Sequence, residues 1–436
     1  MDIKEKLRVL RKKRNSIQKD KKIEDYWQQV SQEKNLSIKQ KLEKLVQIRT
    51  DKLTSKKNKQ IFFEKESQEK ISFYEHPFPL SYVYGKVPLK LGLEISGDIL
   101  YCLSNEPEFE HLDLSSSLFL DLETTGLSGG TGIVPFLVGL GFYQEDHFYI
   151  IQYFLGELSE EEELINQLSQ FLQEMDFKSI ITYHGKGFDI PILETRFILN
   201  RQPFYLTSLP HLDFLYPARS LWRHKYESCK LSHLAKWLVQ AEREDDIPPE
   251  EIPWRYFNYL RTGDLSLIEP ILYHNEQDIL SLLSLVILGA MFFTKEKDLW
   301  IGDGADLFGA GKVFERMGNW EGCINYYQKA LEQGIPDELA LTAKKKLSYF
   351  YKKKQNWSEA ISLWYDLASS NQMFSFRELA MYYEHREKNF KKAREIVERG
   401  LKQSNELPVC RTGRSIYYQE DFEYRLKRLQ RKISKK

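Results

Sequence analysis

Cysteine is scarce in this sequence. The 436 residues include four Cys, at positions 102, 229, 323 and 410, and no two of them have the C-x-x-C spacing of zinc knuckles and redox motifs. A disulfide framework and a cysteine-based zinc site are therefore not indicated. Unpaired cysteines are typical of reducing compartments, so we expect a cytoplasmic protein.

Long apolar runs are absent too. The longest apolar stretch, residues 279–293, has about 15 residues and contains two serines, whereas a membrane-spanning helix needs about 20. We therefore expect a buried helix at this position and no membrane partner. The Lys-rich beginning of the chain lacks the apolar core of a secretory signal.

A net charge is also missing, because 63 Lys and Arg residues balance 63 Asp and Glu residues. The balance hides a segregation of charge along the chain. Residues 1–70 contain 21 basic and 11 acidic side chains, residues 111–300 contain 14 and 28, and residues 401–436 contain 10 and 4. An acidic middle between basic ends favours a nucleic-acid partner or another acidic surface.

Five segments can be distinguished along the chain. Residues 1–70 contain too few apolar residues for a core and form either a mobile arm or an arm that contacts nucleic acid. Residues 71–110 form an extended lead-in. In residues 111–297, three consecutive strand patterns and then strand–helix alternation predict a mixed sheet flanked by helices. Residues 304–403 contain helical repeats, and residues 404–436 form a basic tail.

The repeats have aromatic anchors. Trp320, Trp357 and Phe390 are separated by 37 and 33 residues, which is close to the 34-residue tetratricopeptide period. Helix pairs of this kind stack and bury a shared face. We therefore predict an all-α, tetratricopeptide-like array, which would also offer a surface to a protein partner.

Two acidic residues mark the end of a predicted buried strand at residues 118–122. Asp121 and Glu123 are two positions apart, so their carboxylates point to the same face of the sheet. Such a pair is stable beside a hard cation such as Mg²⁺, which prefers oxygen ligands. An ordinary acidic strand end is the alternative.

A second acidic position lies on a predicted helix. His274 and Asp278 are four residues apart and share a helix face, so a metal-binding carboxylate and a general base could address one site. A solvated helix end is the alternative. Asp189, which follows the Gly-bracketed turn of residues 184–188, either joins such a site or caps a helix.

Three short motifs occur in a fixed order along the chain, and together they indicate a family more specifically than any one of them does. They are DLETTGL at residues 121–127, HGKGFD at residues 184–189 and HNEQD at residues 274–278. Together they resemble the DEDD superfamily of 3′–5′ exonucleases, which has an α/β ribonuclease H-like fold, and most of all its YprB-type ribonuclease H-like proteins. The PFPL segment at residues 77–80 and the helical C-terminal region also fit that family.

The resemblance implies a role for each residue. Asp121, Glu123 and Asp278 would hold one Mg²⁺ or Mn²⁺, and Asp121 and Asp189 would hold a second ion. Two such ions clamp an in-line displacement at phosphorus. The substrate would be DNA or RNA, single-stranded or with a free 3′ end. Beside its terminal nucleotide would lie Thr124, Thr125 and His184.

Two positions depart from the superfamily pattern. His274 has the spacing at which members with a catalytic Tyr carry that Tyr, and Tyr273 has the spacing of the catalytic His. We expect His274 to orient the attacking water, with Tyr273 as the alternative. His184 replaces a usual Asn, and it either faces the substrate or packs in a second layer around the site.

Three further alternatives stay open at this point. Residues 222–225 (WRHK) either stack on single-stranded nucleic acid or contain an ordinary core Trp. The nuclease domain is either active or a relic on a scaffold that binds nucleic acid or protein through its repeats and basic ends. An active site, in turn, cuts either from a 3′ end or internally.

Overall fold

The computed structural model describes residues 72–126, 132–243, 246–294, 302–406 and 414–434. The basic arm predicted for residues 1–70 lies outside these ranges and stays a prediction. None of the helices within the ranges is both long and apolar enough to cross a lipid bilayer.

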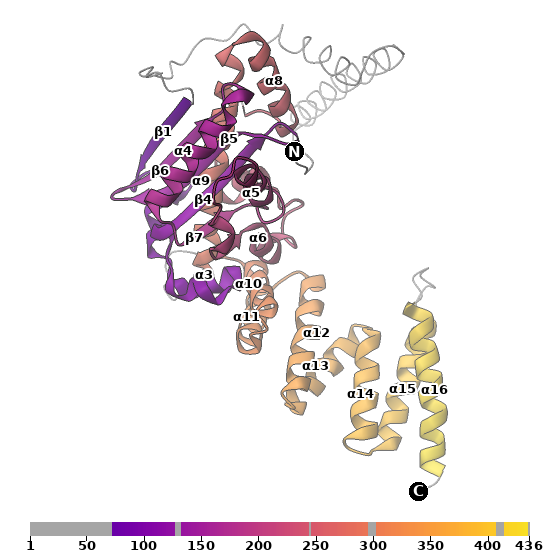
Figure 1. Ribbon diagram of the computed structural model, residues 1–436. Helices are drawn as coiled ribbons and strands as arrows, with labels where there is room; N and C mark the ends of the chain where they lie inside the picture. Colours follow the sequence, from indigo (N-terminus) through magenta and orange to yellow (C-terminus); the bar gives the residue numbers. More distant parts are fainter. Residues whose placement is uncertain (1–71, 127–131, 244–245, 295–301, 407–413, 435–436) are drawn as a thin grey trace, which may run out of the picture. The chain divides into compact units, whose positions relative to one another are not determined.

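A six-stranded sheet forms the centre of the first domain (Figure 1). Its strands are β1 Ser72–Pro79, β4 Ser117–Thr124, β5 Pro135–Gln144, β6 His147–Phe154, β7 Ser179–Thr182 and β8 His211–Asp213. They lie in the order β1-β6-β5-β4-β7-β8. β7 is parallel to both β4 and β8, whereas the other neighbours are antiparallel. The sheet is therefore mixed, as predicted.

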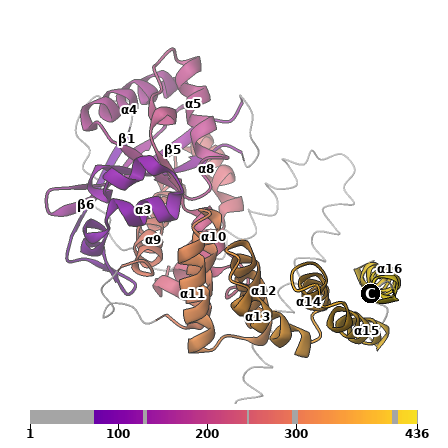
Figure 2. The same ribbon diagram turned by 90° about the horizontal axis from the view of Figure 1, so that it is seen from below.

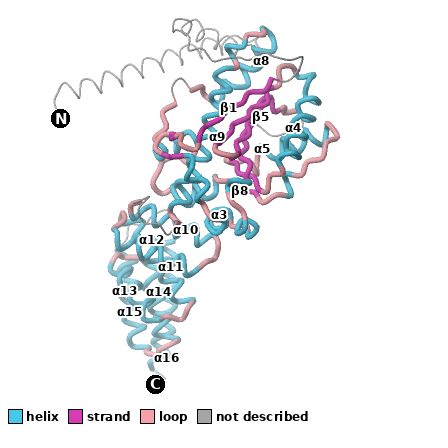
Figure 3. Tube along the Cα trace, turned by 90° about the vertical axis from the view of Figure 1, so that its left-hand side faces the viewer, coloured by secondary structure: helices cyan, strands magenta, loops and turns pink. Residues whose placement is uncertain are grey.

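Helices cover both faces of this sheet, among them α4 Glu161–Met175, α5 Asp189–Leu199, α6 Leu215–Trp222, α8 Ile252–Thr262 and α9 Glu269–Met291. Figure 3 shows the sheet nearly edge-on, with α9 on one side and α4 and α5 on the other. On β4, Leu120 belongs to the core with α4 and α5, and Phe119 belongs to the core with α9. Because alternate strand residues share a face, Asp121 and Glu123 project toward α9.

The long apolar stretch predicted as a buried helix forms most of α9. Pro270 lies in the first turn, where a missing backbone N–H costs nothing. From Ile279 to Ala290 every side chain is buried. The preceding turns carry the polar residues His274, Asn275 and Asp278, which therefore reach the carboxyl end of β4.

The C-terminal region is entirely helical, which confirms the all-α prediction, while its assignment to tetratricopeptide repeats stays a prediction. Consecutive helices lie side by side (Figure 2). They are α10 Gly304–Arg316, α11 Trp320–Gln333, α12 Asp337–Lys353, α13 Trp357–Ser369, α14 Met373–His385, α15 Phe390–Glu406 and α16 Arg414–Ser434. The three aromatic anchors each begin a helix, at α11, α13 and α15.

The basic tail predicted for residues 404–436 includes α16. Glu384 on α14 is 2% exposed and accepts hydrogen bonds from Arg425 (3.0 Å), Arg428 (2.6 Å) and Lys432 (2.9 Å). Breaking such a buried network would leave an uncompensated charge. These three basic side chains therefore bind the helical array itself.

Candidate active site

Asp121 is held in place by a chain of buried amides. Asn275 Nδ2 donates to Asp121 Oδ2 over 2.8 Å, and Gln152 Nε2 donates to Asn275 Oδ1 over 2.9 Å. Both amide side chains are fully buried. Gly139 lies opposite Asp121 on β5, and a Cβ atom there would lie 2.1 Å from Asn275 Oδ1. Only glycine leaves room for this contact.

Four carboxylates converge at the carboxyl end of β4. Asp189, the first residue of α5, accepts a hydrogen bond from the backbone of Leu122; this bond and one from its own backbone oppose the effect of burial, which raises the pKa of Asp189 to about 7. Burial, and after it the charge of Asp278, raises the pKa of Asp121 and of Glu123 well above the ordinary range. The structure thus brings together the four acids that the motifs selected.

His274 points into this group. Its Nδ1–H donates to Asp246 Oδ1 over 2.6 Å, and its Nε2 lies 3.5 Å from Asp278 Oδ2 and 3.9 Å from Glu123 Oε1. Burial lowers the pKa of His274, but the hydrogen bond with Asp246 and the charge of Asp278 outweigh it, so the pKa is raised. His274 therefore stands beside the carboxylates, with Nδ1 engaged and Nε2 facing them.

The sequence analysis missed both Asp246 and Arg243. The Arg243 side chain is 8% exposed, and its Nη2 lies 2.5 Å from Asp278 Oδ1 in an ion pair that is not aligned as a hydrogen bond. Nη2 also donates to Gln277 O (3.1 Å) and Ser281 Oγ (2.8 Å), and Nη1 donates to Asp246 Oδ2 (3.1 Å). Arg243 and Asp246 thus fasten one loop to the polar turns of α9.

The predicted substrate-contacting residues lie at the same edge of the sheet. Thr124 Oγ1 donates to Gly126 O (2.7 Å), and Thr125 Oγ1 accepts from the Val134 N–H (3.0 Å), so both hydroxyls hold the turn after β4. His184 follows β7 with an exposed side chain and a left-handed φ of 75°. Contact of these three residues with a nucleotide stays a prediction.

The four side chains of residues 222–225 lie in different environments and do not form one binding surface. Trp222 is fully buried, so the core interpretation holds and stacking of this ring on a base is excluded. His224 Nε2 lies 2.6 Å from Ala305 O, and Lys225 Nζ lies 2.8 Å from Asp306 Oδ2. Arg223 alone of these residues projects into a pocket.

The donor set suits a hard divalent cation, because crowded carboxylates repel one another until a cation lies between them. In the described residues, however, no group of three or more His, Cys, Asp or Glu side chains stands close enough to hold an ion. Arg243 already forms an ion pair with Asp278, and a cation bound at Asp278 would compete with this partner.

Comparisons with known proteins agree with this reading of the fold. Residues 118–288, which contain all four carboxylates, match the RNase_H superfamily. Over 323 residues the chain is 33% identical to the uncharacterized protein YprB of Bacillus subtilis (strain 168), a match that covers 72% of this chain and 75% of that protein. The fold and the match define an RNase H superfamily protein. Within that superfamily, the chain belongs to the YprB family.

A solved structure is similar over a smaller part. It is the family B DNA polymerase from the hyperthermophilic archaeon Pyrobaculum calidifontis, with 15% sequence identity and a TM-score of 0.34. The similarity covers 48% of this chain and 28% of the polymerase, so the chain spans little more than a quarter of that protein.

Proposed function

We propose that the protein is a metal-dependent 3′–5′ exonuclease that hydrolyses phosphodiester bonds of DNA or RNA. The observation that carries the proposal is the convergence of four carboxylates, from β4, α5 and α9, with a histidine nitrogen beside them. The RNase H superfamily match over the same residues supports it. The helical repeats would serve a protein partner, as the sequence predicts.

The carboxylates would divide between two Mg²⁺ or Mn²⁺ ions. Asp121, Glu123 and Asp278 would hold one, and Asp121 and Asp189 would hold the other. Two bound ions of this kind activate water and stabilise the leaving oxygen in phosphoryl transfer.

His274 would supply the general base. Its Nδ1 is engaged by Asp246, so Nε2 is the nitrogen that accepts a proton from the attacking water. The water oxygen then forms a bond to phosphorus while the bond from phosphorus to the 3′ oxygen breaks. Thr124, Thr125 and His184, at the same sheet edge, would lie along the terminal nucleotide.

The test is digestion of end-labelled single- and double-stranded DNA and RNA with Mg²⁺ or Mn²⁺. We expect a ladder that shortens from the 3′ end, and loss of at least about 100-fold in rate for Asp121→Asn, because this carboxylate serves both ions. Glu162→Gln removes an exposed carboxylate on α4, on the opposite face of the sheet, and should retain full activity. Equal rates for Asp121→Asn and the control would refute the site, and internal cuts would indicate an endonuclease.

A second candidate is an inactive scaffold on the nuclease fold. The observation that favours it is Arg243, which already satisfies part of the charge of Asp278 without a metal. The same digestion decides between the two: Mn²⁺-dependent cleavage that disappears in Asp121→Asn excludes the scaffold, whereas strand binding without cleavage supports it.

A further inference from the structure

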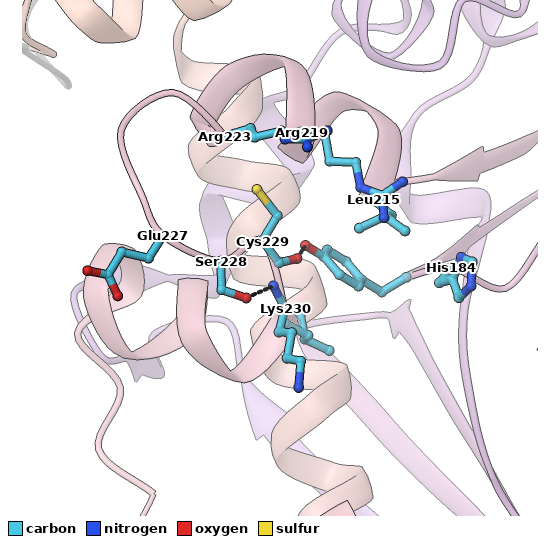
Figure 4. Close-up of a pocket in the computed structure, with 10 residues that line it drawn as sticks. His184, Leu215, Arg219, Arg223, Glu227, Ser228, Cys229 and Lys230 are labelled. Atoms are coloured by element: carbon cyan, nitrogen blue, oxygen red, sulfur yellow. Dashed lines mark hydrogen bonds between the residues drawn. The ribbon is translucent and has the colours of Figure 1, made fainter. Parts of the chain in front are cut away.

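A pocket of about 500 Å³ lies beside the loop that carries the second motif. Tyr183 and His184, which follow β7, form one wall, and residues of α6 and the loop after it form the others. The Tyr183 hydroxyl donates to Cys229 O, which ties the end of β7 to that loop. Figure 4 shows His184 at one end and Arg219, Arg223 and Lys230 around the remaining space.

The pocket is strongly cationic. Arg219, Arg223 and Lys230 line it, all three are exposed, and Glu227 is the single acid among the lining residues. Within the described part of the chain, none of the three cations forms an ion pair with a carboxylate. By contrast, the neighbouring Lys225 binds Asp303 and Asp306. Unpaired guanidinium groups in a concave site match the fork geometry of phosphate oxygens.

The position of the pocket relates it to the carboxylates. β4, β7 and β8 are parallel neighbours, so their carboxyl ends meet at one edge of the sheet. Asp121 and Glu123 lie at the end of β4, whereas the pocket begins at the end of β7 and is closed by α6, which directly follows β8. Two strand spacings are roughly 10 Å, a distance that a few nucleotides of a single strand cover.

We propose that this pocket binds the phosphate backbone of single-stranded nucleic acid, a few nucleotides away from the bond that is cleaved. Arg219 and Arg223 would each contact a phosphate, Lys230 would add a third positive charge, and the exposed His184 ring would lie between the pocket and Asp189. The inference rests on the proposed function in one respect, the placement of the 3′ end of the strand at the carboxylates. Binding of the strand in the pocket needs neither metal nor hydrolysis.

The test measures binding of a fluorescent single-stranded 20-mer to the full-length protein in EDTA, by anisotropy at several salt concentrations. For the double variant Arg219→Gln, Arg223→Gln we expect at least about fivefold weaker binding. The slope of log K against log salt should become shallower by about 1.4, since each single-strand phosphate contact contributes about 0.7. The Lys-rich arm is present in every variant, so its contribution cancels in the comparison.

The matched control is Lys178→Gln, Arg261→Gln, which removes two exposed positive charges elsewhere. Lys178 directly precedes β7 and therefore lies at the opposite edge of the sheet. This control should retain both the affinity and the salt slope. Unchanged affinity and slope in the pocket variant, or equal losses in the control, would overturn the proposal.

Hydrolysis of the p-nitrophenyl ester of thymidine 5′-monophosphate separates the two proposals, because this small substrate does not reach the pocket. The pocket variant should retain the wild-type rate on it. If the pocket variant binds the strand more weakly but the wild type does not hydrolyse the ester, the proposed nuclease activity is refuted and the proposed strand binding in the pocket stands. If the wild type hydrolyses the ester but the pocket variant binds the strand as well as the wild type does, only the proposed strand binding in the pocket is refuted.

Discussion

Asp246 determines which nitrogen of His274 faces the candidate site. Burial raises the pKa of Asp246, but the hydrogen bond and charge of His274, together with Arg243, outweigh it and lower the pKa. Asp246 is therefore ionised and accepts the Nδ1 proton of His274. This arrangement leaves Nε2 as the basic nitrogen beside Glu123 and Asp278.

The substitution Asp246→Asn tests this role. The amide removes the negative charge that raises the pKa of His274, so the acid limb of the rate profile should move to lower pH. The rate at its maximum should fall about 10–100-fold, as is typical when a residue that orients a ligand or base is lost.

The measurement is the pH dependence of kcat from 5 to 9, with Glu242→Gln as the control from the same loop. Glu242 is exposed, so its variant should keep the wild-type profile. A lower rate with an unchanged acid limb would show that Asp246 only stabilises the loop.

The sequence predicted the five motif residues of the candidate site and missed Arg243 and Asp246. The motif acids stand out because they interrupt an apolar strand or share a helix face. Asp246 is one of several acids in the segment 242–246. It lies 28 residues before His274, a separation that corresponds to no helix or strand period, so the sequence does not indicate their contact. Arg243 could have been noticed as a single basic residue among acids. Its ion pair with Asp278, however, becomes visible only in the folded chain.

At the scale of elements, β4, β6 and α9 are joined by one chain of side-chain hydrogen bonds. Gln152 on β6 donates to Asn275 on α9, which donates to Asp121 on β4. The chain passes over β5 at Gly139, where any side chain would occupy the position of the Asn275 amide. The spacing between the sheet and α9 at this point therefore depends on a glycine.

Gly139→Ala should destabilise the protein by about 1–3 kcal/mol, the usual cost of overpacking a core. The new methyl group displaces Asn275 and leaves buried amide groups without partners, so urea midpoints should fall. Gly132→Ala is the control, since a Cβ atom there meets nothing within 4 Å. Equal midpoints for the two variants would show that Asn275 moves aside without cost.

Much of the fold was predictable because its strands are short apolar runs and α9 is one long apolar run. The exceptions lie in residues 71–110, which the sequence analysis assigned to an extended lead-in and which contain the helix α3 Gly97–Ser104 and the strand β1. The residues of β1 alternate between exposed and partly buried, and this strand pairs with β6 across more than 60 residues of sequence. The backbone partner of an edge strand is a long-range property that local patterns do not encode.

At the scale of the whole molecule, the basic residues differ in whether they pair with acids of the chain itself. Several basic residues of the C-terminal segment bind Glu384 within the helical array, and Lys225 binds acids at the start of α10. The cations of the pocket remain available to a ligand. In the acidic segment, the four carboxylates of the candidate site lie near one another, and their mutual repulsion destabilises the folded state when they are ionised.

The burial of Asp189 predicts how the stability of the metal-free protein depends on pH. Burial raises the pKa of Asp189 from 3.8 to about 7, so the folded state binds this proton more tightly than the unfolded state does. The stabilising contribution is complete below the unfolded value and is lost as the pH rises toward and through 7. In EDTA, we therefore expect Tm to fall by several degrees between pH 5 and pH 8.

The decrease should have two signatures that a general pH effect lacks. Mg²⁺ or Mn²⁺ should restore Tm at pH 8 more than at pH 5, because cations bind the ionised carboxylates. Asp189→Asn should flatten the decrease in EDTA, whereas Glu162→Gln should not. Thermal melts of the three proteins with and without metal decide the matter. If Asp189→Asn keeps the wild-type slope, the Asp189 carboxyl does not take up a proton on folding near neutral pH, and the case for a cation beside it fails.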